Sequence, residues 1–402
     1  MGESVVVTGM ECITAVGENL ETSWGKITKG QTNAGHVQGI NYDQEHLTDI
    51  ACHIGNRMSP EQGLGFFEVN TANALRCMAN MVDHYGFDQG SFRNSGLIVA
   101  STSAGMGLYE EFHEKYNQAG KTVVDQDHLD EGLYSLFSCV MEGIAYKYQT
   151  SGFMTTIESA CASGSVALIM AHDLIAQGAE EMVIVVGVDM LCNTTFNGFS
   201  ALKVMESKVY RPFDQNREGL FLGDGAAVIV LESEAHALKR KGKIIGRLKG
   251  GGLTCDAHDL TAPHPEGKEA QLAMEKAIGQ SGISIEDIGY INAHGTGTVF
   301  NDITETKAIK GALGEGWKQT HVSSTKSMTG HTLGAAGVLE AVLTLKSLNE
   351  SLVPPTANLE DPAENCQLNH VIKEAVHNSK KAAMSNSFGF GGINASVIFE
   401  KY

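Results

Sequence analysis

The sequence has few of the features that indicate a membrane, secreted or fibrous protein. Only 7 of its 402 residues are proline, and aromatic residues make up 7% of the chain. Its longest strongly apolar run covers residues 182–188, whereas a membrane-spanning helix needs about 20 apolar residues. The segment from Met1 to Ser4 has no basic stretch followed by an apolar one, so no secretory signal is expected. We therefore expect a cytoplasmic protein that does not associate with membranes.

Positive charge is also scarce. The chain has 29 Lys and Arg against 47 Asp and Glu, which gives a formal net charge of −18 at pH 7. Nucleic acids and anionic lipid surfaces attract basic surfaces, so neither is an expected partner. An acidic protein partner would need a local basic patch.

Cysteine pairs of the CxxC type are absent, although the chain has eight cysteines. Their scattered positions do not suit a zinc site or a disulfide framework and favour reduced thiols in a cytosolic protein. Most should be small buried side chains. They lie at positions 12, 52, 77, 139, 161, 192, 255 and 366.

Strand and helix patterns alternate along the chain. Apolar, β-branched runs typical of buried strands cover 5–8, 95–100, 182–188 and 226–231. Helical spacing of apolar residues covers 70–84, 163–177, 268–281 and 337–347. This alternation predicts an α/β protein with a mainly parallel or mixed sheet. No Pro- or Ser-rich linker divides the chain, but a coarse break falls at 233–250.

One cysteine stands in an unusual setting. Cys161 lies in Ser-Ala-Cys-Ala-Ser-Gly, between a short apolar stretch and an apolar helical pattern. A cysteine at a helix N-terminus has amides nearby that favour the thiolate and can donate to a developing oxyanion. The segment alone also fits a buried structural cysteine, so both interpretations stay open at this point.

Two histidines occur among small residues beyond the break at 233–250. His294 lies in Asn-Ala-His-Gly-Thr-Gly-Thr, after a predicted strand over 289–292. His331 lies in Thr-Gly-His-Thr-Leu-Gly-Ala-Ala-Gly. No bulky neighbour in the sequence shields either imidazole. A lone histidine is usually structural, but two in such loops, together with Cys161, indicate a catalytic set.

These three segments resemble the signatures of the β-ketoacyl-ACP synthases, in the Cys-His-His subgroup that includes the elongating synthase II. Four further stretches match in the same order along nearly the whole chain. They are Val5 to Gly9, Arg211 to Asp214, Gly223 to Gly225 and Asn386 to Gly392.

The resemblance implies a thiolase-like fold, with two similar α/β halves in a layered α-β-α-β-α core. We expect residues 1–240 to form the half with the nucleophile and residues 241–402 the half with both histidines. It also implies an acyltransferase that acts with acyl carrier protein. An acyl group passes from the carrier phosphopantetheine to the cysteine, and decarboxylated malonyl-ACP then attacks it in a Claisen condensation. No other cofactor is required.

The resemblance also assigns catalytic roles. Cys161 would be the acylated nucleophile, and its amide would form the oxyanion hole together with the amide of Phe390. His294 and His331 would stabilise the oxygen of the decarboxylating malonyl thioester. The side chain of Phe390 matches an aromatic gate, and neighbouring glycines leave that loop room to move.

Supporting roles follow in the same way. Lys326 and Glu305 would form a buried pair that orients the histidines. Thr296 and Thr298 match residues that bind the pantetheine arm, and Phe199 matches a residue of the acyl tunnel.

A structural monovalent cation, Na⁺ or K⁺, occurs in some family members. The oxygen-rich residues at the matching positions suit a hard cation. They are Asn292, Ala293, Glu340, Ser385 and Asn386.

The expected carrier-docking surface departs from the family pattern. Typical bacterial members have several Lys and Arg where this chain has Ser-Pro-Glu-Gln-Gly-Leu-Gly-Phe-Phe at 59–67. Lys203 and Lys208 remain at matching positions. We therefore also consider a specialised type II polyketide or polyene ketosynthase that works with a dedicated carrier or a chain-length-factor partner.

Other possibilities concern assembly and chemistry. The expected assembly is a homodimer, or a heterodimer with a paralogous ketosynthase-like subunit. A non-catalytic chain-length subunit would usually lack Cys161. A thiolase would carry a second cysteine where this chain has Gly389 to Ile393.

Overall fold

Strands and helices alternate along the computed structural model, which describes residues 2–37, 40, 49–54, 68–88, 90–118, 136–206 and 208–402. The strands are β1 (Val5–Thr14), β2 (Ala34–His36), β3 (Ile50–Cys52), β4 (Gly96–Ala100), β5 (Met154–Ile157), β6 (Met182–Asp189), β7 (Gly225–Ser233), β8 (Gly246–Cys255), β9 (Ile288–Asn292), β10 (His321–Ser323), β11 (Leu352–Val353), β12 (Val376–His377), β13 (Ala382–Gly389) and β14 (Ile393–Lys401). The helices are α1 (Leu20–Ile27), α2 (Val69–Tyr85), α3 (Met106–Gln118), α5 (Cys139–Tyr148), α6 (Ser163–Ala176), α7 (Asn193–Ala201), α8 (Glu234–Lys239), α9 (Lys268–Ser281), α10 (Val299–Leu313), α11 (Lys326–Thr329) and α12 (Ala336–Glu350).

The predicted strands and helices are confirmed. The four β-branched runs are found in β1, β4, β6 and β7, and the four helical patterns in α2, α6, α9 and α12. Glycines in the left-handed conformation follow two of these helices, Gly86 at φ +67° after α2 and Gly282 at φ +65° after α9. Glycine adopts this conformation without a steric penalty, so the sequence ends these helices where the structure does.

Ten of the strands form one mixed sheet in the order β10-β9-β13-β14-β8-β1-β7-β6-β4-β5. Strands β1, β7 and β6 pair antiparallel, and β6, β4 and β5 pair parallel. The same pattern recurs in β8, β14 and β13, followed by β13, β9 and β10. The chain therefore contains two groups of five strands with the same topology, as the predicted similar halves require. The exact division at residues 240 and 241 stays a prediction.

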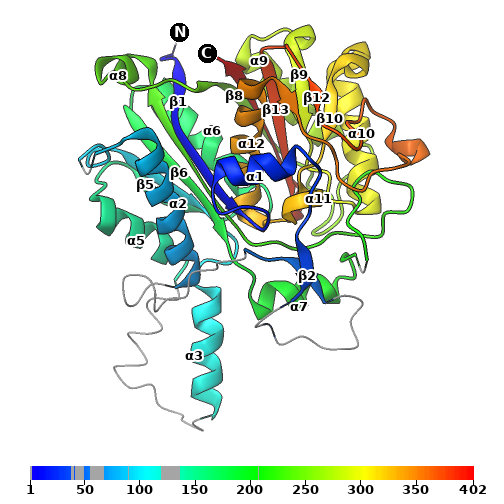
Figure 1. Ribbon diagram of the computed structural model, residues 1–402, viewed down its shortest axis with the longest axis horizontal. Helices are drawn as coiled ribbons and strands as arrows, with labels where there is room; N and C mark the ends of the chain where they lie inside the picture. Colours follow the sequence, from blue (N-terminus) through cyan, green and yellow to red (C-terminus); the bar gives the residue numbers. More distant parts are fainter. Residues whose placement is uncertain are drawn as a thin grey trace.

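Helices separate the two groups of strands into layers (Figure 1). Helices α6 and α12 lie in the middle, since α6 contacts β6 and β14, and α12 contacts β7 and β13. Helix α2 packs on β1 and β7, and α9 packs on β8 and β14. The result is the predicted α-β-α-β-α arrangement. The groups also meet directly where β1 pairs with β8, through Val6 with Arg247 and Val7 with Gly246.

The two central helices touch at glycines near their N-termini. A Cβ atom on Gly164 would lie 2.5 Å from the amide nitrogen of Val338, and one on Gly337 would lie 2.3 Å from that of Ser165. Larger residues at these positions would push the helices apart. The close crossing places the segments just before each helix, with Cys161 and His331, beside one another.

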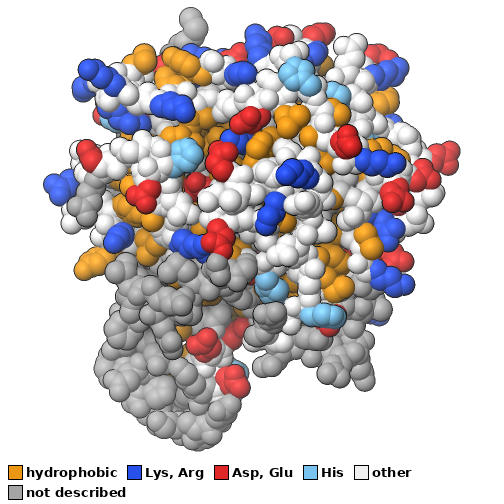
Figure 2. Space-filling view, viewed as in Figure 1, with side chains coloured by type: hydrophobic (Ala, Val, Ile, Leu, Met, Phe, Trp, Pro, Cys, Tyr) orange, Lys and Arg blue, Asp and Glu red, His pale blue; other side chains and the backbone are white. Residues whose placement is uncertain are grey.

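The described surface mixes both signs of charge. Acidic and basic side chains are interspersed on the face shown in Figure 2. Within the described ranges, no helix combines the length and the apolar character needed to span a membrane.

Candidate active site

Cys161 sits on a sharp turn between β5 and α6. Ala160 has a φ of +48°, a left-handed conformation that residues with a Cβ atom seldom adopt. The hydroxyl of Ser163 closes the turn, because it accepts from the Ser159 amide at 2.7 Å and donates to the Ala160 carbonyl at 2.7 Å. The thiol is thereby fixed at the N-terminus of α6, where it is 5% exposed.

Two main-chain amides lie within hydrogen-bonding reach of the sulfur, those of Cys161 itself and of Phe390. The end of β13 can approach this closely because residue 389 is glycine. A Cβ atom there would lie 3.0 Å from the Ser159 carbonyl oxygen and 3.3 Å from the Cys161 amide nitrogen. The paired amides have the arrangement of an oxyanion hole.

The buried position of Cys161 favours the protonated form of its thiol. Burial raises the pKa of Cys161 to about 12, although the positive charge of Lys326 and the two amides oppose the increase. The sequence suggested a thiolate because the cysteine begins a helix. Removal from water outweighs that effect, so the thiol must lose its proton as it attacks.

The main chain of each histidine is fixed by a different partner. His294 follows β9, and its amide donates to the Glu305 carboxylate at 2.8 Å, as the Gly295 amide does at 2.7 Å. The amide of His331 donates to the Phe221 carbonyl at 2.7 Å. The two imidazole rings meet edge to face, with centroids 5.4 Å apart and planes at 84°.

Both imidazoles are neutral at physiological pH. Burial lowers the pKa of His294 and His331 well below the ordinary value, and the charge of Lys326 lowers both further. Each Nδ1 atom is buried without a hydrogen-bond partner in the described part of the chain. A neutral imidazole can accept a proton at one nitrogen and donate from the other, so each ring can serve either purpose.

The predicted substrate residues surround one cavity of about 280 Å³ together with the catalytic set. Phe199 and Phe390 stack across it with centroids 5.6 Å apart, and the Thr296 and Thr298 hydroxyls lie 2.9 Å apart. The lining of this cavity includes Cys161, Phe199, His294, Thr296, Thr298, His331 and Phe390. The sequence analysis missed other lining residues, including Leu202, Asp256, Phe300 and Asn301.

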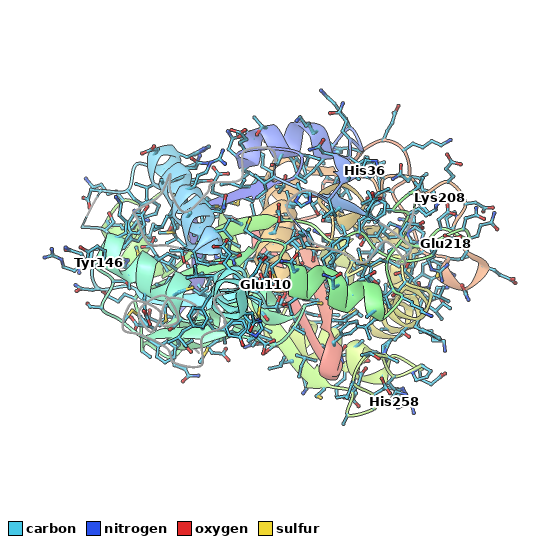
Figure 3. The ribbon with its side chains drawn as sticks, turned by 90° about the horizontal axis from the view of Figure 1, so that it is seen from below. His36, Glu110, Tyr146, Lys208, Glu218 and His258 are labelled. Atoms are coloured by element: carbon cyan, nitrogen blue, oxygen red, sulfur yellow. The ribbon has the colours of Figure 1, made fainter. Side chains whose placement is uncertain are left out.

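Helix α7, which carries Phe199, is anchored by an acid from another helix. Glu110 of α3 accepts from the Asn193 amide at 3.0 Å and the Thr194 amide at 2.6 Å. A carboxylate at a helix N-terminus satisfies free amides and interacts favourably with the helix dipole. Glu110 is labelled near the centre of Figure 3, which views the molecule from below.

The predicted pairing of Lys326 with Glu305 is wrong. Lys326 is fully buried, and its ammonium bonds to the carboxylate of Glu340 in the first turns of α12. The Glu305 carboxylate instead accepts from the two amides at His294 and from the Asn386 side chain at 3.3 Å. Both acids are fully buried, and sequence spacing alone does not tell which of them faces the lysine.

Three of the predicted cation ligands, Asn292, Glu340 and Ser385, lie close together and offer oxygens that suit a hard monovalent ion. The side chain of Asn386 bonds instead to Ser396 and Glu305. Within the described ranges, Glu340 Oε2 and Ser385 Oγ are buried with no hydrogen-bond partner. The Asn292 side chain lies against the Glu340 carbonyl at 3.2 Å. Unsatisfied buried oxygens are costly, so a cation between them would be favourable. Because Lys326 already neutralises the carboxylate of Glu340, a single positive charge suits the site better than two.

The predicted docking residues lie at the surface. Lys203 is exposed and directly follows Leu202, which lines the cavity. Lys208 is also exposed, and Figure 3 shows it at the margin of the molecule near Glu218. The segment 59–67, where the sequence departs from the family pattern, lies outside the described residues.

Comparisons with known proteins agree with this geometry. Residues 2–237 match the model of the β-ketoacyl synthase N-terminal domain, and residues 245–360 match that of the C-terminal domain. The chain is 34% identical to 3-oxoacyl-[acyl-carrier-protein] synthase 2 of Vibrio harveyi over 418 residues, with 99% of this chain and 98% of the relative covered.

Solved structures of similar proteins cover the whole chain. The ishigamide ketosynthase/chain length factor superimposes with a TM-score of 0.92 at 27% identity, and both chains are covered completely. A ketosynthase in the AntDE:AntF complex, described as a type II PKS acyl-carrier protein with its hexaketide-bound ketosynthase, gives a TM-score of 0.91 at 26% identity, again with full coverage of both chains.

Proposed function

Since the chain belongs to the β-ketoacyl synthase family of condensing acyltransferases, we propose that Cys161, His294 and His331 perform a decarboxylative Claisen condensation. The observation that supports these roles is their shared cavity, in which a thiol, two neutral imidazoles and two free amides converge. The substrates are acyl and malonyl thioesters on the phosphopantetheine of an acyl carrier protein, as the names of the relatives suggest.

In the first half-reaction, the Cys161 sulfur attacks the carbonyl carbon of the acyl thioester. The new carbon–sulfur bond forms as the bond to the pantetheine sulfur breaks. A neutral imidazole takes the thiol proton and returns it to the departing pantetheine sulfur. The amides of Cys161 and Phe390 donate to the tetrahedral oxygen, which carries the negative charge.

In the second half-reaction, the malonyl thioester loses CO₂. The bonding electrons pass to the thioester as an enolate, and N–H groups of His294 and His331 stabilise its oxygen. The enolate carbon then attacks the acyl group on Cys161, and the thiol is regenerated with a proton from the medium. The hydroxyls of Thr296 and Thr298 bind the pantetheine arm and hold its thioester at the histidines.

A carrier-based assay tests the nucleophile. Acyl and malonyl carrier proteins are incubated with the wild-type protein, with Cys161→Ala and with Cys255→Ala, which removes an exposed thiol. We expect β-ketoacyl product, and an acyl adduct seen by mass spectrometry, from the wild type and Cys255→Ala only. Undiminished product from Cys161→Ala would contradict the assignment.

Carrier docking is proposed to involve Lys203 and Lys208. Both are exposed, and Lys203 lies beside the cavity lining. Glutamate at either position should raise the KM for carrier-bound substrate and spare a carrier-free pantetheine thioester. An equal loss with both substrates would contradict a docking role.

A specialised polyketide or polyene ketosynthase is the second candidate function. It is favoured by the similarity to the ishigamide ketosynthase/chain length factor and by the loss of basic residues at 59–67. A mass spectrum of the intact protein after exposure to a panel of acyl carriers would separate the candidates. Acylation by saturated chains on a housekeeping carrier alone would count against the specialised function.

We also propose that the chain pairs with a second ketosynthase-like subunit along β5. This strand lies at the sheet edge, and Phe153 and Met154 are 38% and 42% exposed there. Exposed strand edges readily pair with another chain. Sedimentation should give a dimer of this chain alone if the pair is a homodimer, and a dimer only after addition of a paralogue if it is a heterodimer.

A Na⁺ or K⁺ ion is proposed to occupy the site formed by Asn292, Ala293, Glu340, Ser385 and Asn386. It would bind the buried oxygens of Glu340 and Ser385 that have no hydrogen-bond partner in the described residues, and take part in no catalytic step. A higher unfolding temperature in K⁺ or Na⁺ than in tetramethylammonium at equal ionic strength is expected. No difference between the salts would contradict it.

The cysteines support a reducing, cytoplasmic location. All of the eight are free, as expected where cellular thiols keep disulfides from forming.

A further inference from the structure

A buried carboxylate that the proposed mechanism does not use lies at the end of β6. Asp189 is 1% exposed and accepts hydrogen bonds from two separate segments. Its Oδ1 atom accepts from the hydroxyl of Ser101 at 2.8 Å and the amide of Ser103 at 2.7 Å. Its Oδ2 atom accepts from the amides of Gly334 at 2.7 Å and Ala335 at 3.2 Å.

These donors come from different parts of the layered core. Residues 101–103 follow β4, the neighbour of β6 in the sheet. Gly334 and Ala335 come three and four residues after His331 and lead directly into α12. Asp189 therefore connects the strands of the Cys161 group to the segment that carries His331.

The contact between Asp189 and Gly334 is too close for a side chain at residue 334. A Cβ atom on Gly334 would lie 2.9 Å from Asp189 Oδ2 and 2.9 Å from the carbonyl carbon of Ser101. Leu333 lies between His331 and this contact. Its main chain is in the left-handed conformation, with a φ of +50°. A side chain with a Cβ atom is rarely stable in that conformation unless its surroundings hold it there.

Glu305 makes a similar contact with the main chain at the other histidine, His294. It accepts from the amides of His294 and Gly295 and so fixes the main chain of His294. Asp189 does the same for the chain just after His331, and its charge also occupies the positive end of α12. The amides of Gly334 and Ala335, just before α12, are thereby satisfied by a protein side chain.

We propose that Asp189 is a positioning residue for the condensation step. By holding residues 334 and 335, it sets the position of the His331 imidazole relative to Cys161. The inference rests on the proposed function of His331. It assigns to Asp189 no contact with substrate.

Asparagine cannot replace this carboxylate without loss. Both oxygens accept from main-chain amides, Oδ1 from residues 102 and 103 and Oδ2 from residues 102, 334 and 335. In Asp189→Asn, the side-chain NH₂ group must therefore face N–H donors on one side or the other. Two donors in contact repel and leave buried amides unsatisfied.

The test measures the two half-reactions separately. Acyl transfer is followed as the acyl adduct on Cys161, and decarboxylation as CO₂ release from malonyl carrier protein. For Asp189→Asn we expect kcat for decarboxylation to fall on the order of tenfold or more with little change in KM, because a small displacement of a catalytic group is costly. Acyl transfer should stay within about threefold for three reasons. The oxyanion amides at Cys161 and Phe390 are not held by Asp189, His294 remains in place to take the thiol proton, and loss of the Asp189 charge lowers the pKa of the Cys161 thiol.

Glu232→Gln is the matched control. Glu232 is an equally buried acid on β7 that bonds to His236 and Arg240 and does not line the cavity. We expect this variant to lose stability and to retain both half-reactions. Equal reduction of both half-reactions in Asp189→Asn, or no reduction of either, would overturn the proposal.

Gly334→Ala tests the same contact without changing the acid, and serves if Asp189→Asn does not fold. Its methyl group would press on Asp189 Oδ2, so we expect the same selective loss of decarboxylation. A uniform loss or none would overturn the inference. A wild-type protein without either half-reaction would instead overturn the proposed function, which makes the two failures distinguishable.

Discussion

Burial is the main influence on the ionisable residues of the cavity. It raises the pKa of Cys161 to about 12 and lowers the pKa of both histidines well below the ordinary value. These shifts favour a neutral thiol and neutral imidazoles in the unliganded cavity. The positive charge of Lys326 acts on all three groups, and its pairing with Glu340 holds the ammonium in place.

A pH profile should reveal the neutral histidines. Decarboxylation of malonyl carrier protein by Cys161→Ala depends on the two imidazoles and not on the thiol. Since the pKa of each imidazole is well below 6.5, we expect this rate to stay nearly constant between about pH 6 and 8. An inflection at about 6.5, the value for an ordinary histidine, would show that the rings titrate as if exposed.

Glu305 should make stability depend on pH. Burial raises its pKa from 4.5 to about 7, although the amides of Gly295 and His294 oppose the increase. The folded state therefore keeps a proton that the unfolded state has lost. The stability that this proton contributes is fully present below pH 4.5 and is lost as the pH rises to about 7.

The Glu305→Gln variant replaces this carboxyl group with an amide that does not titrate. Urea unfolding at several pH values should show the wild type losing stability relative to the variant as pH rises from about 4.5 to 7, with a constant difference above that range. A difference that is the same at every pH would contradict the shifted pKa.

Removing Lys326 should be strongly destabilising. Lys326→Met leaves the Glu340 carboxylate buried without its partner, and breaking one side of a buried pair typically costs about 3–5 kcal/mol. The double variant with Glu340→Gln should recover part of this loss in urea unfolding. If the single and double variants are equally unstable, the pair is not the cause.

Short motifs were sufficient to select three residues that the structure brings to one cavity, but not the residues that support them. Cys161, His294 and His331 stand in small-residue loops whose chemistry is visible in sequence. The partner of Lys326 depends on which face of α10 or α12 points inward, and sequence spacing does not determine that. Asp189 directly follows the buried run 182–188, so its position at a strand end was a signal that could have been used.

Among the elements, the crossing of α6 and α12 matters most for the site. In Gly337→Ala, the new methyl group would lie 2.3 Å from the Ser165 amide nitrogen. Such overpacking typically costs about 1–3 kcal/mol, and the displaced helices should separate Cys161 from His331. We expect lower stability in urea and a loss of condensation.

Gly279→Ala provides the control for that substitution. Gly279 lies within α9, and no atom lies within 4 Å of its added Cβ. Alanine is favoured over glycine inside a helix by roughly 0.5–1 kcal/mol. This variant should therefore be more stable and fully active. A similar loss in both variants would mean that packing at the crossing is not responsible.

Most elements with regular apolar periodicity were predictable, whereas β8 was not. It contains three consecutive glycines, Gly250 to Gly252, which a sequence pattern assigns to a turn. The structure explains them, because a Cβ on Gly251 would meet the Ile169 side chain at 2.3 Å and one on Gly252 the Ala273 carbonyl oxygen at 1.9 Å. The glycines let α6 and α9 approach the strand from opposite faces, a tertiary requirement that local sequence does not display.

At the scale of the whole molecule, the exposed edge of the sheet should control assembly. Met154→Lys places a charge on β5, where the proposed subunit contact would bury it. We expect the variant to sediment as a smaller species than the wild type. Leu260→Lys, at an apolar residue that is 81% exposed and does not belong to β5, should leave sedimentation unchanged. A dimer that survives Met154→Lys at low protein concentration would argue for a different interface.

The pairing of β8 with both β1 and β14 has a consequence for chain connectivity. Gly246 lies opposite Val7 on one side and Lys401 on the other, so the segments near the first and last described residues pass each other at about two strand spacings, roughly 10 Å. A short glycine linker could join them, and new ends could be opened between Lys243 and Ile244. The resulting circular permutant would present its histidines before its cysteine along the chain, and we expect it to fold and condense acyl groups as the natural order does.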